Sequence, residues 1–188
     1  MFRYFTPDFI FDRIQDIDFD SLKKKNIKGL IFDIDNTLVS YRQERPTKEV
    51  SVLMDKLKTE GFEICFISNN SRQRVDVFNS DFNFFSYPEA KKPSVKFIKR
   101  ALSAMDLKAK NAAFVGDQLF TDVMAAKRAK IMAILVTPIE PLETVFFRFK
   151  RFMEKPFIKR YYRKQRKKSK KFKHSSHKND IIYNENGD

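Results

Sequence analysis

The sequence predicts an α/β fold in which helices alternate with the strands of a parallel sheet. Short apolar runs bounded by polar residues have the composition of strands that are covered on both faces. We expect such strands at residues 28–34, 62–68, 82–86, 111–116 and 131–136. We expect the intervening helices at residues 48–60, 71–79, 93–105 and 119–129. This alternation favours right-handed crossovers and one sheet of about five strands.

Two acidic residues end the first predicted strand. Asp33 and Asp35 stand two positions apart, so in extended chain their carboxylates point the same way, about 7 Å from each other. Open α/β sheets bind ligands at the carboxyl ends of their strands. This spacing lets one carboxylate attack a phosphorus atom while the other serves the leaving oxygen. A calcium loop is excluded, because Leu38 stands where that loop needs glycine and because a strand precedes it.

Three further polar motifs follow in a fixed order along the chain. The second strand ends in Ser-Asn-Asn, a Lys-Lys-Pro run opens the third helical segment, and the fourth strand ends in Gly-Asp with another Asp five residues on. Each motif alone has a structural explanation, such as a helix cap or a solvated surface charge. Together with the first acidic pair, they indicate one shared site. The candidate residues are Ser68, Asn69, Lys92 or its neighbour Lys91, Asp117 and Asp122.

This ordered set resembles the haloacid dehalogenase-like (HAD) superfamily of phosphohydrolases, and the resemblance covers residues 28–137. The first motif of that superfamily, Asp-x-Asp-x-Thr, is matched by Asp33, Asp35 and Thr37. The other motifs are matched by Ser68, by Lys92 or Lys91, and by Gly116, Asp117 and Asp122. The resemblance implies a three-layer, Rossmann-like sheet with strand order 3-2-1-4-5, in which the first and fourth strands are neighbours.

The resemblance also implies a role for each matched residue. Asp33 would be the nucleophile that forms an aspartyl-phosphate, and Asp35 would act as general acid and then as general base. The implied cofactor is Mg²⁺, a hard cation that prefers oxygen ligands. The implied metal-binding residues are Asp33, Asp35 through its backbone carbonyl, Asp117 and, just behind them, Asp122. The implied phosphate-binding residues are Thr37, Ser68, Asn69 and Lys92.

The spacing between motifs leaves no room for a cap domain over the site. The 31 positions from Thr37 to Ser68 are filled by a loop, a helix and the second strand. The 24 positions from Ser68 to Lys92 are filled by a helix and the third strand. We therefore expect a capless site that is open to solvent. Such a site favours a phosphate carried on a macromolecule or a membrane surface over a small metabolite that needs enclosure.

The net charge of +14 is concentrated near the C-terminus. Residues 148–173 hold 14 lysines and arginines against one acid, whereas residues 1–147 carry only +3. We therefore divide the chain into four parts: an N-terminal aromatic arm at residues 1–27, a catalytic core at 28–140, a basic amphipathic helical segment at 141–163, and a basic tail at 164–188 that we expect to be disordered. We expect Pro156 to break or kink the helical segment.

The basic segment suggests which partner the protein binds. Phe146, Phe149, Met153 and Phe157 recur at helical spacing among basic residues, a pattern that suits an anionic membrane surface. Nucleic acid is the alternative partner, because basic tails also bind phosphodiester backbones. The chain has one cysteine and lacks an apolar run long enough to cross a bilayer. We expect a cytoplasmic protein that is peripheral to the membrane.

The motif strings also resemble the YqeG group of HAD phosphatases. That group is similar to enzymes that dephosphorylate phosphatidylglycerophosphate to phosphatidylglycerol, and the resemblance implies a phosphorylated lipid as the substrate. A phosphatase acting on nucleic-acid ends or nucleotides is one alternative. A non-catalytic nucleic-acid-binding or assembly protein with a vestigial site is another, although the intact Asp33, Asp35, Lys92 and Asp117 argue against it.

Overall fold

The structure is a computed structural model that describes residues 2–140, 149 and 152–166. The chain divides into two compact units, residues 1–144 and residues 145–188, and each is described by itself. The predicted catalytic core lies in the first unit, and the basic segment lies mainly in the second.

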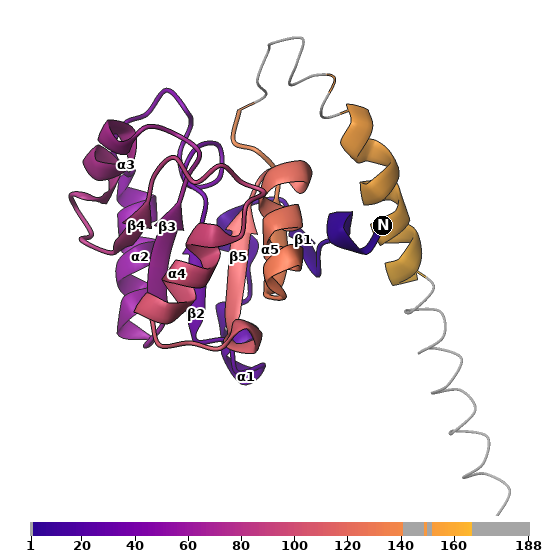
Figure 1. The fold of residues 1–188 in the computed structure, drawn as a ribbon, viewed down its shortest axis with the longest axis horizontal. Coiled ribbons are helices and arrows are strands. Elements are labelled where there is room, and N and C mark those ends of the chain that lie inside the picture. Colours follow the sequence, from indigo (N-terminus) through magenta and orange to yellow (C-terminus); the bar gives the residue numbers. More distant parts are fainter. Residues whose placement is uncertain (1, 141–148, 150–151, 167–188) are drawn as a thin grey trace, which may run out of the picture. The chain divides into compact units, whose positions relative to one another are not determined.

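The first unit contains a parallel sheet with helices on both faces (Figure 1). Its strands are β1 (Phe9–Phe11), β2 (Gly29–Phe32), β3 (Glu63–Ile67), β4 (Phe85–Tyr87), β5 (Ala112–Gly116) and β6 (Met132–Val136). Its α-helices are α1 (Phe19–Lys24), α2 (Lys48–Thr59), α3 (Arg72–Asn79), α4 (Lys96–Ala104) and α5 (Met124–Ala129). Short helical turns are η1 (Phe2–Phe5), η2 (Ile14–Asp16), η3 (Ala109–Asn111) and the π-helical η4 (Leu119–Val123).

The strand order is β1-β6-β5-β2-β3-β4, and every pair is parallel. The five predicted strands and their order are confirmed. The sheet has a sixth strand, β1, which comes from the aromatic arm and pairs with β6 at the edge. Strand β1 has only three residues and follows Pro7, so the sequence pattern is too short to show it. Asp8 ties the arm to the sheet, because its carboxylate accepts a hydrogen bond of 2.8 Å from the Ala133 backbone N–H.

The helices form the outer layers. In Figure 1, α4 and α5 lie side by side in front of the sheet and α2 lies behind it. The strands between them are buried on both faces, as the apolar runs predicted; every residue of β2 and of β5 is buried. Phe66 of β3 has its ring 5.3 Å from the ring of Phe78 on α3, in an edge-to-face contact that helps hold α3 to the sheet.

Some predicted boundaries are corrected. The helix expected at 93–105 begins at Lys96, because Ser94 closes a turn onto Lys91 with a backbone hydrogen bond of 2.9 Å. The strand expected at 82–86 is the shorter β4. The helix expected at 119–129 consists of the π-helical turn η4 followed by α5.

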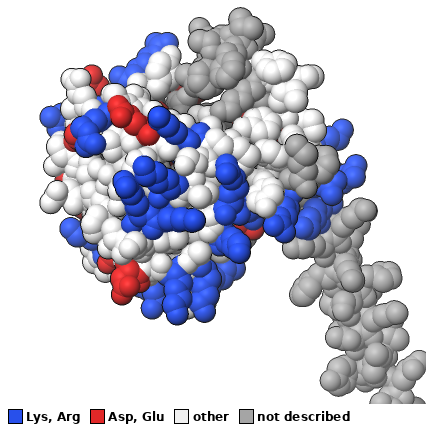
Figure 2. Space-filling view, viewed as in Figure 1, with Lys and Arg blue, Asp and Glu red and all other residues white. Residues whose placement is uncertain are grey.

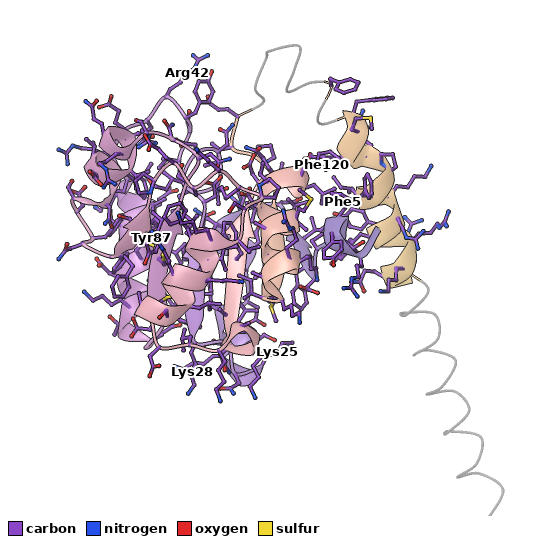
Figure 3. The ribbon with its side chains drawn as sticks, viewed as in Figure 1. Phe5, Lys25, Lys28, Arg42, Tyr87 and Phe120 are labelled. Carbon is purple, nitrogen blue, oxygen red and sulfur yellow. The ribbon has the colours of Figure 1, made fainter. Side chains whose placement is uncertain are left out.

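The N-terminal arm also covers η4. The ring of Phe5 in η1 packs edge-on against the ring of Phe120 in η4, with 5.4 Å between their centroids (Figure 3). Because η4 carries Asp122, this contact supports the back of the predicted site. Through β1 and η1, the aromatic arm therefore covers one edge of the core.

The loops at the carboxyl ends of the strands carry no inserted domain within the described residues. Chain segment 33–47 joins β2 to α2, and segment 88–95 joins β4 to α4, without a further helix or strand in either. The sheet register brings two of these ends together, because Phe32 of β2 pairs with Val115 of β5. The backbone N–H of Asp33 extends this pairing with a hydrogen bond of 2.9 Å to the Val115 carbonyl.

In the second unit, residues 152–166 form one helix. This helix runs through Pro156, so the chain is not broken there, and its described part extends to residue 166, three residues past the limit expected at 163. Pro156 is the fifth residue of this stretch, and a proline inside a helix removes one backbone N–H and leaves one carbonyl without its usual partner. Residues 141–148, 150–151 and 167–188, including Phe146 and most of the expected disordered tail, lie outside the described residues. Among the described helices, none has the length and apolar character needed to span a bilayer.

Candidate active site

The turn after β2 fixes the first two acidic side chains. Asn36 adopts a left-handed backbone conformation with φ of 62°. The backbone N–H groups of Leu38 and Val39 then fold back onto the carbonyl of Ile34. Asp33 therefore precedes a tight, hydrogen-bonded turn at the carboxyl end of a buried strand, and Asp35 lies within that turn. Asparagine suits this position because its short polar side chain tolerates the left-handed region.

Three buried carboxylates converge at this end of the sheet. Asp33 follows β2, Asp117 follows β5, and Asp122 lies in η4; each offers an oxygen within 4.8 Å of the others. Gly116 makes the approach of Asp122 sterically feasible, because a Cβ at position 116 would lie 2.5 Å from the Asp122 carboxylate. Carboxylate oxygens at such spacing are the ligands that a hard divalent cation prefers. The donor set therefore fits a magnesium ion.

Lys92 lies among these carboxylates. Its Nζ is 2.6 Å from Asp33 Oδ1 and 2.8 Å from Asp122 Oδ1, and it donates a hydrogen bond of 3.0 Å to the carbonyl of Ile67. The side chain of Lys92 is 2% exposed, whereas Lys91 points to solvent. The structure thus brings Lys92 into the site and leaves Lys91 out.

The side chain of Asn69 fixes the backbone of this lysine. Its Oδ1 accepts a hydrogen bond of 2.7 Å from the Lys92 N–H, and its Nδ2 donates one of 3.4 Å to the Lys92 carbonyl. Asn69 follows β3 and Lys92 follows β4, so these two bonds join the loops at the ends of neighbouring strands. The side-chain amide of Asn69 therefore orients the lysine.

Burial and charge shift the ionisation of the central pair. Burial raises the pKa of Asp33 well above its usual range; Lys92 opposes this shift, and Asp122 and Asp117 reinforce it. Burial lowers the pKa of Lys92, but the carboxylates of Asp122 and Asp33 outweigh it and raise the pKa overall. Three buried acids thus face one ammonium group. The resulting excess of negative charge is a second reason why a divalent cation fits here.

Asp35 is held separately from the carboxylate cluster. Its Oδ1 accepts a hydrogen bond of 2.9 Å from Arg74 on α3. Its Oδ2 accepts one of 3.1 Å from the Asn70 side chain and a longer one of 3.5 Å from Ser68 Oγ. The carboxylates of Asp33 and Asp35 therefore have different partners.

An open cavity of about 290 Å³ lies over these groups. Its walls are formed by Asp33, Asp35, Ser68, Asn69, Asn70, Lys92, Gln118 and Thr121. Thr37 is not among them. It lines a separate cavity of about 780 Å³, and its buried Oγ1 has no hydrogen-bond partner among the described residues. The structure therefore brings together every predicted site residue except the side chain of Thr37.

The cavity lies at the end of the sheet where the carboxyl ends of the strands meet. Figure 3 shows Arg42, from the loop after β2, at the opposite end of the unit from Lys25 and Lys28, which precede β2. Figure 2 shows lysines and arginines spread over the face formed by α4 and α5.

Comparisons with known proteins show the family of the chain. A model of HAD-hydrolase-like proteins matches residues 89–138. The curated protein "Probable phosphatase YqeG" from Bacillus subtilis (strain 168) is 33% identical over 153 residues, which cover 81% of this chain and 89% of that protein. The chain belongs to the YqeG-like group of HAD-superfamily phosphatases. This HAD phosphatase is also 27% identical over 128 residues to a glyceraldehyde 3-phosphate phosphatase from Pyrococcus furiosus, but the match spans only 48% of that protein.

Two solved structures share the fold of this HAD phosphatase. A hypothetical protein from Xanthomonas campestris has a TM-score of 0.50 at 13% identity, covering 67% of this chain and 72% of that one. CbbY from Rhodobacter sphaeroides, solved with xylulose-(1,5)bisphosphate, has a TM-score of 0.50 at 14% identity. The match covers 60% of this chain and 86% of that one. At these identities the likeness shows the three-layer α/β fold alone.

Sequence reasoning missed several residues of the site. Asn70, Gln118 and Thr121 line the cavity, and Arg74 contacts Asp35 from outside it. Asn70 and Gln118 each stand next to a motif residue, so adjacency was a usable signal. Arg74 lies 39 positions from Asp35, and only the packing of α3 against the turn after β2 brings the two together.

Proposed function

We propose that this phosphatase is a Mg²⁺-dependent phosphomonoester hydrolase that works through an aspartyl-phosphate on Asp33. The observation that carries the proposal is the Asp33 carboxylate, which lines the open cavity and contacts buried Lys92 at 2.6 Å. The ammonium group of Lys92 favours a phosphoryl group beside this carboxylate, where two negative charges would otherwise repel each other.

The proposed reaction has two steps. In the first, an Asp33 oxygen attacks phosphorus, the ester P–O bond breaks, and the Asp35 carboxyl gives its proton to the leaving oxygen to release an alcohol. In the second, Asp35 takes a proton from water, whose oxygen attacks the aspartyl-phosphate. Inorganic phosphate leaves, Asp33 is restored as a carboxylate, and Asp35 regains its proton. Asp35 fits both parts, since it lines the cavity and is apart from the carboxylate cluster.

We propose that Mg²⁺ binds at Asp33, Asp117 and the backbone carbonyl of Asp35, with Asp122 behind them. When bound, the ion supplies positive charge that offsets the approach of a carboxylate to a phosphate dianion. The support is the buried acidic cluster, with its oxygens within 4.8 Å of one another. Ser68, Asn69 and Lys92 are the proposed phosphate ligands. The side chain of Thr37 is excluded from that set because it does not line the cavity.

The proposed substrate is phosphatidylglycerophosphate, a phosphorylated lipid. One support is the open site, which has no inserted cap within the described residues and so leaves access for a phosphate held at a membrane surface. Another is the membership of the YqeG-like group, whose resemblance to phosphatidylglycerophosphate phosphatases suggests this substrate. The relative named for glyceraldehyde 3-phosphate makes a small soluble ester the second candidate.

The decisive test measures phosphate release with Mg²⁺ from phosphatidylglycerophosphate in mixed micelles, from glyceraldehyde 3-phosphate and from a 5′-phosphorylated oligonucleotide. Asp33→Asn provides the blank for each substrate. Turnover on the lipid that the blank lacks supports the proposal. Turnover on another ester would keep the chemistry and overturn the substrate. Absence of turnover on all three would favour a vestigial site.

We also propose that the basic segment binds an anionic membrane surface from the cytoplasmic side, as a peripheral contact. Helix 152–166 carries exposed Phe152 (64%), Met153 (44%) and Tyr162 (50%). Its basic residues are Lys155, Lys159, Arg160, Arg163, Lys164 and Arg166. Basic residues near an anionic bilayer each add about 1 kcal/mol of attraction. Co-sedimentation with vesicles that contain phosphatidylglycerol tests this; equal retention on neutral vesicles would contradict it.

A further inference from the structure

Arg74 joins the proposed acid–base residue to the loop that follows it. Its Nη2 donates to Asp35 Oδ1 at 2.9 Å and to the Gln43 carbonyl at 2.7 Å. Its Nη1 donates to the Glu44 carbonyl at 2.6 Å. One guanidinium on α3 therefore holds both the Asp35 carboxylate and the backbone of residues 43 and 44.

The guanidinium itself is fixed in place. The side chain of Arg74 is only 10% exposed, and its charged carbon lies 5.7 Å from the centre of the Phe78 ring on the same helix. A buried charge is costly to desolvate unless it is paired and hydrogen-bonded. A surface salt bridge would add little, but here the two terminal nitrogens of a buried guanidinium contact one carboxylate and two carbonyls, while Nε has no partner among the described residues. The two carbonyl contacts would be enough to anchor the loop at residues 43 and 44. The third contact, to the Asp35 carboxylate, therefore indicates a further role for Arg74.

The position of Asp35 depends on this contact. Arg74 engages Oδ1, while Asn70 and Ser68 face Oδ2. A hydroxyl both donates and accepts, so Ser68 can stay in contact with Oδ2 whether or not that oxygen carries a proton. Arg74 can therefore keep Oδ1 throughout the reaction, with Oδ2 available to exchange a proton inside the cavity.

We propose that Arg74 is a positioning residue that aims the Asp35 carboxyl at the leaving-group oxygen of the substrate. The inference rests on the proposed function, in which Asp35 protonates that oxygen. Arg74 does not line the cavity, so it acts through Asp35 rather than on the phosphoryl group. Small displacements of a catalytic group have large effects on rate, and a shift of 1 Å can cost about 100-fold.

This role predicts a dependence on the leaving group. An alkyl phosphate releases a poor leaving group that needs a proton from Asp35, whereas p-nitrophenyl phosphate releases a stable phenolate that does not. Loss of Arg74 should therefore slow the alkyl ester far more than the aryl ester. A purely structural role would slow both substrates by the same factor.

The experiment compares kcat for the two ester classes in the full-length protein with Mg²⁺, using the alkyl ester on which the wild type is active. The variants are Arg74→Met, Asp35→Asn and, as a matched control, Arg72→Met, since Arg72 is an exposed arginine in the same helix turn. We expect Arg74→Met to lower the alkyl-to-aryl ratio of kcat about tenfold or more, toward the ratio of Asp35→Asn. We expect Arg72→Met to keep the wild-type ratio.

Arg74→Lys is a second variant, for the case that Arg74→Met does not fold. It keeps the positive charge, but one ammonium group cannot reproduce the fork that reaches Asp35 and both carbonyls, so its ratio should also fall. A wild-type ratio in a folded Arg74 variant would overturn the inference while the proposed function stands. A wild-type ratio in Asp35→Asn would remove the proposed acid role and this inference with it. Lack of activity in the wild type on both ester classes would instead contradict the proposed function.

Discussion

Lys92 Nζ lies 2.6 Å from Asp33 Oδ1, and the two side chains are 2% and 7% exposed. The lysine comes from the loop after β4 and the aspartate from the end of β2, two strands that are not neighbours in the sheet. This pair stands over the strand between them, β3, whose last carbonyl also binds Lys92. Because the pair is shielded from solvent, the attraction between its charges is stronger than it would be in water. Substitutions of these two residues therefore test the proposed site.

Replacing Lys92 with methionine should damage both activity and stability. The change removes the proposed phosphate ligand and leaves Asp33 and Asp122 buried without their cation. We expect kcat to fall about 100-fold or more, and the free energy of unfolding to fall by about 3–5 kcal/mol without Mg²⁺. Kinetics and urea denaturation measure these effects. Lys91→Met is the matched control, because Lys91 is exposed and adjacent; equal damage from both variants would contradict the assignment.

The raised pKa of Asp33 predicts how stability varies with pH in the metal-free protein. The unfolded chain loses the proton of an aspartate near pH 4, while the folded protein keeps it to higher pH. The protonated Asp33 therefore stabilises the folded protein. This contribution is complete below pH 4 and is lost as pH rises through the pKa of Asp33 in the folded protein. Asp33→Asn lacks this contribution.

The measurement is urea denaturation with a chelator at a series of pH values. The free energy of unfolding of the wild type minus that of Asp33→Asn should decrease as pH rises above 4, with a slope of at most about 1.4 kcal/mol per pH unit. Parallel curves for the two proteins would show that the ionisation of Asp33 is unperturbed.

Gly116→Ala should disturb the acidic cluster. The new Cβ would lie 2.5 Å from three atoms of the Asp122 side chain, so that side chain must move away from Lys92. We expect lower kcat and weaker stabilisation by Mg²⁺. Gly29→Ala is the control, because its Cβ meets mainly the flexible end of Leu107, at the start of β2 and away from the site. Equal loss of activity in both variants would point to a general packing defect.

Mg²⁺ should stabilise the folded protein, and Asp117 should be needed for this. An ion that binds only the folded state adds about 2.7 kcal/mol at 100 times its Kd. We expect Mg²⁺ to raise the melting temperature, chelation to reverse the rise, and Asp117→Asn to abolish most of it. Asp106→Asn is the control, since Asp106 is exposed and asparagine accepts its left-handed φ of 51°. An undiminished rise in Asp117→Asn would remove that residue from the proposed metal site.

Much of this arrangement could be predicted from the sequence, because parallel strands deliver their carboxyl ends to one edge. Asp33 and Asp117 each follow a continuous apolar run, and that pattern alone locates them. Lys92 could not be distinguished from Lys91 in this way, since the hydrogen bonds between the Asn69 side chain and the Lys92 backbone, which hold that lysine inward, arise only in the folded chain.

Other features depend on contacts that leave no local pattern. Strand β1 is three residues long and exists through pairing with β6 and through the bonds of Asp8. Arg74 looks like any surface arginine of an amphipathic helix, until α3 packs beside the turn after β2. Thr37 matches its motif in sequence, yet the tight turn after Asp35 buries its side chain away from the cavity.

The measurement that tests the central claim most directly is detection of the phosphoryl group on Asp33. The enzyme is mixed with substrate and Mg²⁺, quenched in acid during turnover, and treated with borohydride, which reduces an acyl phosphate to an alcohol. Peptide mass spectrometry then reads residue 33. The account predicts homoserine at position 33 only when substrate was present, and unmodified Asp35 and Asp117. Phosphate release with unmodified Asp33, or modification of a different aspartate, would contradict it.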